Sequence, residues 1–209
     1  MNYITIPVTA FAQNCSIVWN EETRHCSLID PGGDAAKLIK AIEQHKLIPQ
    51  AVWLTHGHMD HVGGARAIAD HYHIPIIGPQ EEDAFWLDAL PMQAQRFGLP
   101  HAEALKPNQW LKHGDTLKLD DYSFEVRYTP GHTPGHVVLY SPDLKTVFVG
   151  DVLFAGSIGR TDFPRGNHQQ LLDSIASQLL TLEDDIEVVP GHGPNTTIGY
   201  ERQTNPYLS

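Results

Sequence analysis

Long apolar runs, clustered cysteines and an excess of basic residues are all missing from this chain of 209 residues. No apolar stretch approaches the roughly 18 residues that a membrane-spanning helix needs, so we expect no membrane partner. The N-terminal segment MNYITIPVTAFAQNCSIVW lacks the basic residues that open a signal peptide, and its alternation favours a strand. These absences favour a cytoplasmic protein.

Cysteine and positive charge are both scarce. Cys15 and Cys26 lie in strand-like stretches without CxxC spacing, so we expect buried free thiols in a reducing compartment. Against 25 Asp and Glu stand 14 Lys and Arg, which gives a formal net charge of −11. Such a surface repels phosphate backbones and argues against nucleic acid as a partner. A GxSxG segment, which would carry a serine nucleophile, is also missing.

The apolar content is that of a folded protein, since hydrophobic residues make up 41%, and we expect one domain over residues 1–209. Helices are expected after Asp34, which can cap the first of them, and over 62–69 and 171–179. The segment from about Gln80 to Gly114 is irregular. Two mixed sheets packed face to face, with helices outside, would bury the strands. The expected strands are Tyr3–Val8, Ser16–Trp19, Cys26–Ile29, Ala51–Leu54, Ile74–Ile77, Phe124–Tyr128, Val137–Tyr140, Thr146–Val149 and Ile186–Val189.

Histidine is abundant, with 13 copies, and four candidate metal ligands occur within the segment THGHMDH. His56 and His58 alternate about Gly57, so an extended loop turns both toward one point. Asp60 and His61 follow within a few ångströms of chain. A lone HxH suits a polar turn as well as a metal site. The full HxHxDH favours metal, because four such groups together need a charge to satisfy them.

Three further candidates each follow a predicted strand. His132 lies in PGHTPGH, Asp151 follows the apolar strand TVFVG, and His192 lies in PGHG. Singly, such a histidine is more typical of a turn, and such an aspartate of a helix cap. Loops at strand ends meet along one sheet edge, which makes the set consistent. His136 is expected only to pack or hydrogen-bond beside the site.

Five imidazoles and two carboxylates exceed the four ligands of one tetrahedral zinc ion, so the set suits two divalent ions that share a carboxylate. Nitrogen-rich ligands favour zinc, and iron or manganese is chemically admissible. A water or hydroxide between the ions would complete both coordination shells. We assign His56, His58 and His132 to the first ion, Asp60, His61 and His192 to the second, and Asp151 to both.

Motif by motif, and over almost the whole chain, these residues resemble the metallo-β-lactamase superfamily. The resemblance implies an αβ/βα four-layer sandwich of two mixed β-sheets with helices on the outer faces, and metal ions at one edge. Asp30 falls where the family keeps an acidic residue, which implies that it orients a ligand. A simple turn aspartate explains Asp30 nearly as well.

The run GDVLFAGSIGRTDFPRG, with PGHTPGH and PGHG, resembles glyoxalase II and its short relatives, the hydroxyacylglutathione hydrolases. That resemblance implies a thioesterase acting on S-lactoylglutathione or a related glutathione thioester. Arg160 falls where glyoxalase II has a basic residue that contacts glutathione, whereas Thr161 and Asp162 replace aromatic residues. Phe163 and Arg165 are further candidates to line the substrate cleft. We expect no counterpart of the helical C-terminal domain of glyoxalase II, and hence weaker substrate binding.

The expected chemistry is attack of a metal-held hydroxide on a thioester carbonyl, since metal binding lowers the pKa of water from about 16 to about 7. One ion would stabilise the oxyanion that forms. The thiolate, with a thiol pKa of about 8.5, leaves without a strong general acid. Asp60 and Asp151 are the expected catalytic residues, and the sequence predicts no particular oligomeric state.

Four alternatives remain at this point. A persulfide dioxygenase shares the fold and the IGRTDF-like segment, and would use one iron held by two histidines and Asp151. A β-lactamase with paired zinc ions commonly has cysteine at the position of Asp151. Flavin-linked di-iron reductases have glutamate at the position of His58. A binding module without catalysis would not need the complete ligand set.

Overall fold

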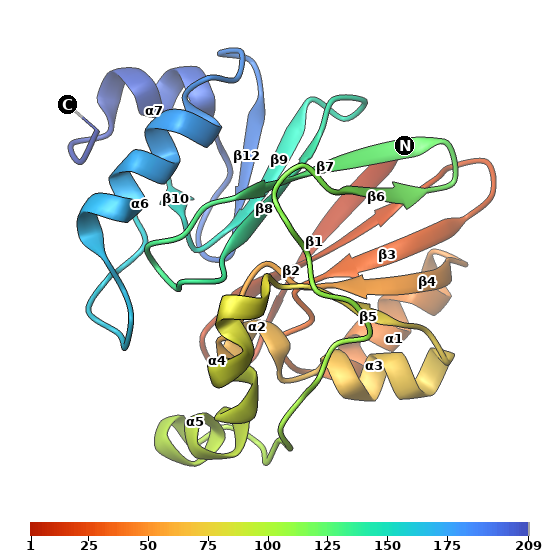
Figure 1. The fold of residues 1–209 in the computed structure, drawn as a ribbon. Helices are drawn as coiled ribbons and strands as arrows, with labels where there is room; N and C mark the ends of the chain where they lie inside the picture. The colour runs from red at the N-terminus through yellow and green to blue at the C-terminus, as the bar shows by residue number, and fades with distance from the viewer. Residues whose placement is uncertain (209) are drawn as a thin grey trace.

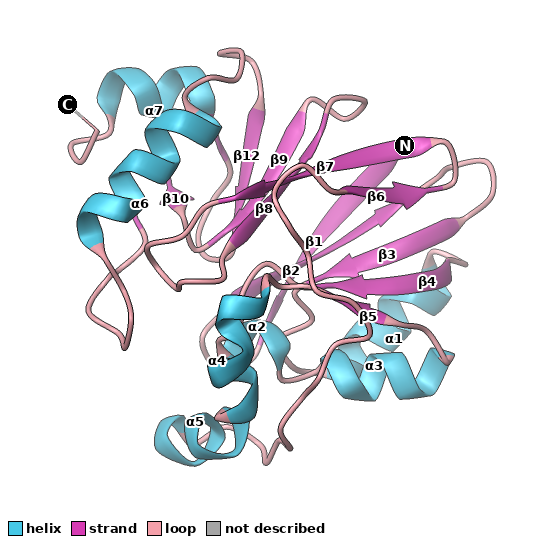
Figure 2. Cartoon of the chain, viewed as in Figure 1, coloured by secondary structure: helices cyan, strands magenta, loops and turns pink. Residues whose placement is uncertain are grey.

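Two β-sheets pack face to face, and helices cover their outer faces, in a computed structural model that describes residues 1–208 (Figure 1 and Figure 2). The chain builds one sheet from its N-terminal part and the other from its C-terminal part. This arrangement confirms the predicted αβ/βα sandwich of two mixed sheets.

The N-terminal part forms a five-stranded sheet. Its strands are, in spatial order, β1 (Asn2–Val8), β2 (Gln13–Trp19), β3 (His25–Ile29), β4 (Ile48–Trp53) and β5 (Ile76–Ile77). The first three strands are antiparallel, whereas β3, β4 and β5 run parallel. Parallel neighbours need a crossover connection, which helices supply here. The crossover helices are α1 (Ala35–Gln44), α2 (Met59–Val62) and α3 (Ala65–Tyr72).

The C-terminal part forms a six-stranded sheet with the spatial order β13-β12-β9-β8-β7-β6. Its strands are β6 (Thr116–Leu119), β7 (Tyr122–Tyr128), β8 (Val137–Ser141), β9 (Thr146–Gly150), β12 (Glu187–Pro190) and β13 (Thr196–Thr197). β9 and β12 are parallel, and α6 with the π-helical η2 crosses between them. The remaining elements here are β10 (Leu153–Phe154), β11 (Ser157–Ile158), α6 (His168–Ser174), η2 (Ile175–Leu179) and α7 (Ile198–Thr204).

Apolar side chains fill three layers of the sandwich. Between the sheets, the rings of Trp53 and Phe124 lie 4.8 Å apart, edge to face. Leu38 of α1 and Ile68 of α3 pack on the outside of the first sheet, and Leu171 of α6 packs on the outside of the second. The central strands are therefore buried on both faces, which explains their nearly continuous apolar sequences.

The middle of the chain is more regular than its sequence predicts. Residues 81–97 form η1 (Glu81–Asp83), α4 (Ala84–Asp88) and α5 (Leu90–Phe97). Helices this short draw their stability from tertiary packing, and Leu87 and Leu90 are buried. The short strands β6, β10, β11 and β13 are also not predicted by the sequence pattern.

The first helix begins where the sequence predicts, but the Asp34 side chain does not cap it. Asp34 has a φ of 47°, and its carboxylate makes no hydrogen bond to the start of α1. It accepts the backbone N–H of Thr9 at 2.8 Å instead. Asp34 therefore fastens the turn between β1 and β2 to the start of the helix.

Four strand ends carry the predicted ligand motifs to one edge of the sandwich (Figure 1). β4 leads into THGHMDH, and the loop between β7 and β8 contains PGHTPGH. β9 leads into Asp151, and β12 leads into PGHG. Rigid strands thus fix the ends of all of these loops.

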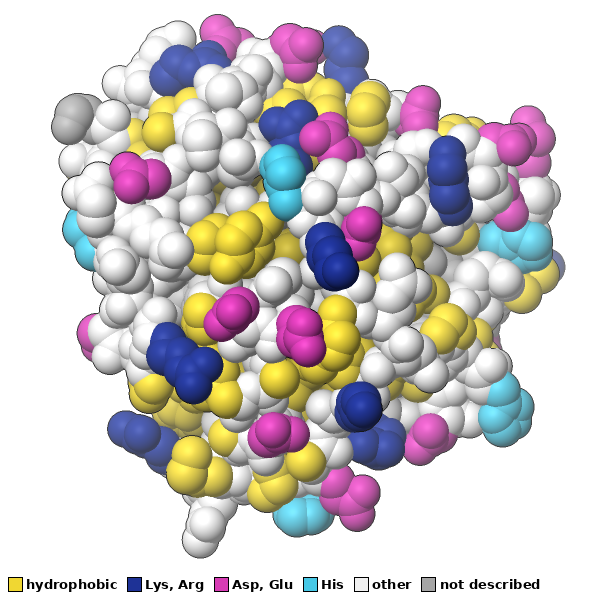
Figure 3. Space-filling model, viewed as in Figure 1, with side chains coloured by type: hydrophobic (Ala, Val, Ile, Leu, Met, Phe, Trp, Pro, Cys, Tyr) yellow, Lys and Arg dark blue, Asp and Glu magenta, His cyan; other side chains and the backbone are white. Residues whose placement is uncertain are grey.

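Composition predicts no membrane partner, no basic surface and two buried thiols. None of the helices among residues 1–208 is long and apolar enough to cross a membrane. On the face seen in Figure 3, acidic and basic side chains are interspersed with apolar ones rather than gathered into a basic surface. Cys15 and Cys26 are buried free thiols, as predicted.

Candidate metal centre

Asp30, at the end of β3, holds the start of the THGHMDH loop. Its Oδ1 accepts the backbone N–H of Thr55 at 2.8 Å, and its Oδ2 accepts the Thr55 hydroxyl at 2.6 Å. The chain then enters α2, where the N–H of His61 donates to the carbonyl oxygen of His58 at 3.0 Å. One helical turn therefore returns His61 toward the loop, and the rings of His56, His58 and His61 are all buried.

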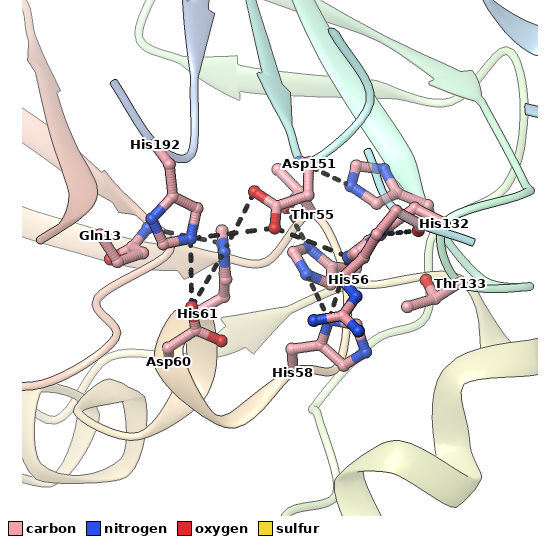
Figure 4. Close-up of polar contacts among 12 residues, drawn as sticks. Gln13, Thr55, His56, His58, Asp60, His61, His132, Thr133, Asp151 and His192 are labelled. Carbon is pink, nitrogen blue, oxygen red and sulfur yellow. Dashed lines mark hydrogen bonds and ion pairs between the residues drawn. The ribbon is translucent and has the colours of Figure 1, made fainter. Parts of the chain in front are cut away.

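A first cluster joins two nitrogens of this loop to one from the β7–β8 loop (Figure 4). Nε2 of His56 lies 3.2 Å from Nδ1 of His58, and Nε2 of His132 lies 3.0 Å from that Nδ1. The three atoms lie within 4.8 Å of one another. Zn–N bonds of about 2.0 to 2.1 Å in a tetrahedral site place nitrogens about 3.4 Å apart, so this spacing fits one ion.

The other ring nitrogen of His56 and of His132 fixes the tautomer. The Thr55 hydroxyl donates to Asp30, so it accepts from Nδ1 of His56 at 3.0 Å. Nδ1 of His132 donates to the carbonyl oxygen of Arg160 at 2.7 Å. Both rings therefore present an unprotonated Nε2 to the cluster, which is the form that binds a metal.

A second cluster consists of Asp60, His61 and His192. Oδ2 of Asp60 lies 3.1 Å from Nε2 of His192 and 3.8 Å from Nε2 of His61. Nδ1 of His61 donates to Oδ2 of Asp30 at 2.9 Å, and Nδ1 of His192 donates to the carbonyl oxygen of Phe11 at 3.3 Å. These two rings also present Nε2 to their cluster.

Asp151 lies between the two clusters (Figure 4). Its Oδ1 is 3.3 Å from Nε2 of His61. Its Oδ2 is 3.6 Å from Nε2 of His132 and 3.8 Å from Nε2 of His192. The carboxylate therefore approaches candidate ligands of both clusters, as a shared ligand must.

Buried polar atoms without hydrogen-bond partners fit a centre that binds cations. Nε2 of His61 and Oδ1 of Asp151 are buried and make no hydrogen bond, although the two atoms lie 3.3 Å apart. Nδ1 of His58 carries at most one proton, so it can donate to only one of the unprotonated Nε2 atoms of His56 and His132. Since buried polar groups are almost always satisfied, these donor atoms fit divalent ions.

The electrostatics of the centre agree with this fit. Burial lowers the pKa of His56 and His58, so both rings are neutral, as metal ligands are. Burial opposes protonation of His61, but the carboxylates of Asp151 and Asp60 outweigh it and raise the pKa of His61. Burial alone would raise the pKa of Asp151, yet the neighbouring His61 holds it well below its usual range. The two carboxylates thus attract positive charge to this point.

His136 supports the centre from beside it, as the sequence predicts. Its Nε2 accepts the backbone N–H of Asp151 at 3.1 Å. Its ring stacks on that of His56, with centroids 4.6 Å apart and planes at 18°. His136 therefore contacts one candidate ligand through packing and another through a hydrogen bond.

Asp83 belongs to the same region, although no motif marks it. Its buried carboxylate accepts the N–H of Gly57 at 2.8 Å, the Thr133 hydroxyl at 2.8 Å and the N–H of Gly135 at 2.6 Å. Burial raises its pKa to about 6 despite these hydrogen bonds. The only local signal, Gln80 capping η1, points to a helix start rather than to a site.

A cleft of about 420 Å³ opens over the two clusters. Its floor includes candidate ligands from both, and much of its wall is apolar. The apolar wall consists of Phe11, Met59, Trp86, Phe97, Leu99, Phe154, Ile158 and Phe163.

Two of the three predicted substrate-binding residues line the cleft, and the third does not. Arg160 and Phe163 line the cleft, and the Arg160 guanidinium lies 4.3 Å from the centre of the Phe163 ring. Nε and Nη2 of Arg160 also donate to Asp162, both at 2.6 Å. Arg165 lies outside the residues that line the cleft, because its guanidinium packs over the ring of Phe85 at 4.3 Å.

Comparison with known proteins agrees with this geometry. The family model described as metallo-beta-lactamase superfamily matches residues 8–192. Hydroxyacylglutathione hydrolase GloC of Haemophilus influenzae is 50% identical, over 100% of this chain and 99% of that protein. The crystal structure of BLEG-1 B3 metallo-beta-lactamase is 37% identical, with a TM-score of 0.92 over 100% of both chains. The crystal structure of TTHA1623 in a di-iron-bound form is 36% identical, with a TM-score of 0.89 over 98% of this chain and 100% of that one.

Proposed function

Because the chain belongs to the metallo-beta-lactamase superfamily, we propose that it is a metal-dependent hydrolase of glutathione thioesters, S-lactoylglutathione among them. The observation that carries this proposal is the place of Asp151, between two clusters of candidate ligands and beneath one cleft. The identity of 50% to a protein named hydroxyacylglutathione hydrolase supports the substrate class.

The proposed cofactor is a pair of divalent ions. Zinc suits the nitrogen-rich donor set, and the di-iron form of TTHA1623 supports iron as an alternative. The proposed ligands are His56, His58 and His132 for one ion, Asp60, His61 and His192 for the other, and Asp151 for both.

Two ions bound here would lower the pKa of a water molecule to about 7 and polarise a carbonyl group, which is the chemistry that thioester hydrolysis requires. The centre is preorganised by hydrogen bonds within the chain. Hydrogen bonds from Nδ1 hold His56, His61, His132 and His192 in the metal-binding tautomer. The carboxylates of Asp60 and Asp151 would supply the negative charge that retains the ions.

The apolar wall of the cleft suits the thioester end of the substrate rather than its charged end. A substrate that covers this wall would displace water from the region above the clusters, which would strengthen the electrostatic interactions there. Asp162 occupies two nitrogens of Arg160, and Nη1 is left to meet a substrate carboxylate. Because the Arg160 side chain is 60% exposed, we expect this contact to add on the order of 1 kcal/mol.

The test is an assay of S-lactoylglutathione hydrolysis with protein of known metal content, in parallel with oxygen uptake on glutathione persulfide. We expect hydrolysis without oxygen uptake. Oxygen consumption by protein with one iron per chain, and no hydrolysis, would favour the persulfide dioxygenase instead.

A further inference from the structure

We propose that Asp83 is a positioning residue that sets the affinity of the first metal site by locking the His56–His58 loop to the His132 loop. This inference rests on the proposed function, since it takes those histidines as ligands of one ion. Asp83 itself touches none of the ligand atoms. It acts through backbone and hydroxyl groups that lie next to the ligands in the chain.

The two loops come from different sheets and must meet within a narrow distance. The His56–His58 loop follows β4 of the first sheet, and the His132 loop joins β7 to β8 of the second. Nδ1 of His58 and Nε2 of His132 lie only 3.0 Å apart. A ligand set divided between two sheets needs a tie near the ion, because small displacements at the ends of loops are otherwise easy.

Asp83 supplies that tie from a third segment. Oδ2 accepts both the N–H of Gly57, which stands between His56 and His58, and the hydroxyl of Thr133, which follows His132. One oxygen atom therefore bonds to both loops. Oδ1 accepts the N–H of Gly135 and so holds the second loop at another point.

The packing around Asp83 is too close for larger residues. A Cβ added to Gly135 would lie 2.5 Å from the backbone nitrogen of Asp83, and one added to Gly57 would lie 2.7 Å from Cβ of Trp86. The Asp83 segment and the two loops thus form one tightly packed block. Asp83 is fully buried, and all three of its hydrogen-bond donors are neutral. Burial of its charge therefore costs folding free energy, and a role at the metal site would explain why a carboxylate is kept here.

The main test is metal binding by Asp83→Ala, measured as two dissociation constants by competition with a chelator for zinc. Loss of a residue that orients ligands typically weakens a metal site ten- to a hundredfold. We expect this loss at one step only, with the other step unchanged. His192→Ala, which removes a ligand of the second site, identifies the step that belongs to each site.

Glu201→Gln is the matched control. Glu201 is also a fully buried carboxylate with three neutral donors, namely the N–H of Gly156, the Thr196 hydroxyl and the Asn205 amide, but it touches neither loop. We expect it to lower the thermal stability and to leave both dissociation constants unchanged. Equal weakening of both sites by Asp83→Ala, or no weakening, would overturn the inference.

A milder pair of variants covers the case in which Asp83→Ala fails to fold. Thr133→Val removes the hydroxyl that Asp83 binds, whereas Thr133→Ser keeps it. We expect Thr133→Val to weaken the first site and Thr133→Ser to restore it; equal affinities in the two variants would contradict the inference. If the unsubstituted protein binds no ion, the proposed function itself fails, and the two failures are thereby distinguished.

Discussion

Asp151 follows directly on β9, and its carboxylate approaches His61 at 3.3 Å and His132 at 3.6 Å. Both histidines are already held from behind, by Asp30 and by the carbonyl oxygen of Arg160. The charge of Asp151 therefore has a fixed set of partners. Its removal leaves two oriented imidazoles without the group that stands between them.

Asp151→Ala should lose bound metal and nearly all hydrolytic activity while keeping the fold. The reason is that it removes the carboxylate that lies between the two clusters. We expect the rate to fall by at least about a hundredfold. Elemental analysis and steady-state rates, with circular dichroism as the check on folding, measure this. Full turnover in the variant would rule out a shared ligand at this position.

Arg160→Ala should raise KM for S-lactoylglutathione about fivefold and leave kcat nearly unchanged, as loss of a uniform binding contact of about 1 kcal/mol predicts. A small thioester without the peptide should show no change. The comparison variant is Lys145→Ala, which breaks a surface pair with Asp185 outside the cleft. Equal losses on both substrates would mean that Arg160 only steadies its own loop through Asp162.

Asp83 should give the stability of the metal-free protein a measurable pH dependence. Burial raises its pKa to about 6, whereas an aspartate in an unfolded chain has a pKa of about 3.9. The native state thus holds the proton more tightly. The contribution of Asp83 to the free energy of unfolding is therefore lost as pH rises from about 4 to about 6, by roughly 3 kcal/mol.

The variant Asp83→Asn lacks this contribution. Urea denaturation of both proteins, with a chelator present, gives the difference in the free energy of unfolding at pH 4 and at pH 7. We expect the variant to lose less free energy of unfolding than the unsubstituted protein between pH 4 and pH 7. A difference that is the same at both pH values would show that Asp83 does not titrate in this range.

The sequence identifies those residues whose chemical type and position in the chain are enough to mark them as candidate metal ligands. His56, His58 and His61 share one short segment, and His132 and Asp151 each follow a strand. The tautomers of His61 and His132 could not be predicted, because the partners of Nδ1 come from other segments. His56 has an adjacent partner in Thr55, but the Thr55 proton goes to the distant Asp30. Asp83 stayed hidden for the same reason: its three hydrogen-bond donors are far from it in the chain.

At the scale of single elements, α5 and the turn between β1 and β2 form the rim of the cleft. Phe97 ends α5 and Phe11 lies in that turn, and their rings meet edge to face at 6.2 Å. Each is 43% exposed. Exposed aromatic side chains beside a cleft favour contact with an apolar part of a ligand. The sequence predicts no helix at α5, because eight residues give only about two turns of pattern, although Pro91 stands where proline is favoured in helices.

Phe97→Ala should lower kcat/KM for thioesters with a bulky apolar acyl group about fivefold, as the loss of about 1 kcal/mol of apolar burial predicts. The lactoyl thioester should be affected much less, since its acyl group is small and polar. Met92→Ala is the control, because Met92 is on the same helix, is 63% exposed and does not line the cleft. An equal decrease for both acyl groups would argue for a structural effect on α5.

At the scale of the whole molecule, the layered architecture was predictable and its pairing was not. Apolar strands that alternate with amphipathic helices, as in Ala51–Leu54 before 62–69, can be buried only in a layered fold. The sequence does not show that β12 would pair in parallel with β9, since that choice depends on the crossover through α6. That pairing brings His192 beside Asp60.

The metal content of the active protein is the decisive measurement. Purified protein is stripped of metal, titrated with zinc, and measured at each step for bound zinc and for S-lactoylglutathione hydrolysis. Two clusters joined by Asp151 predict saturation at two ions per chain, with hydrolysis that reaches its maximum as the second ion binds. Saturation at one ion would contradict the two-ion assignment, and two bound ions without hydrolysis would contradict the proposed activity.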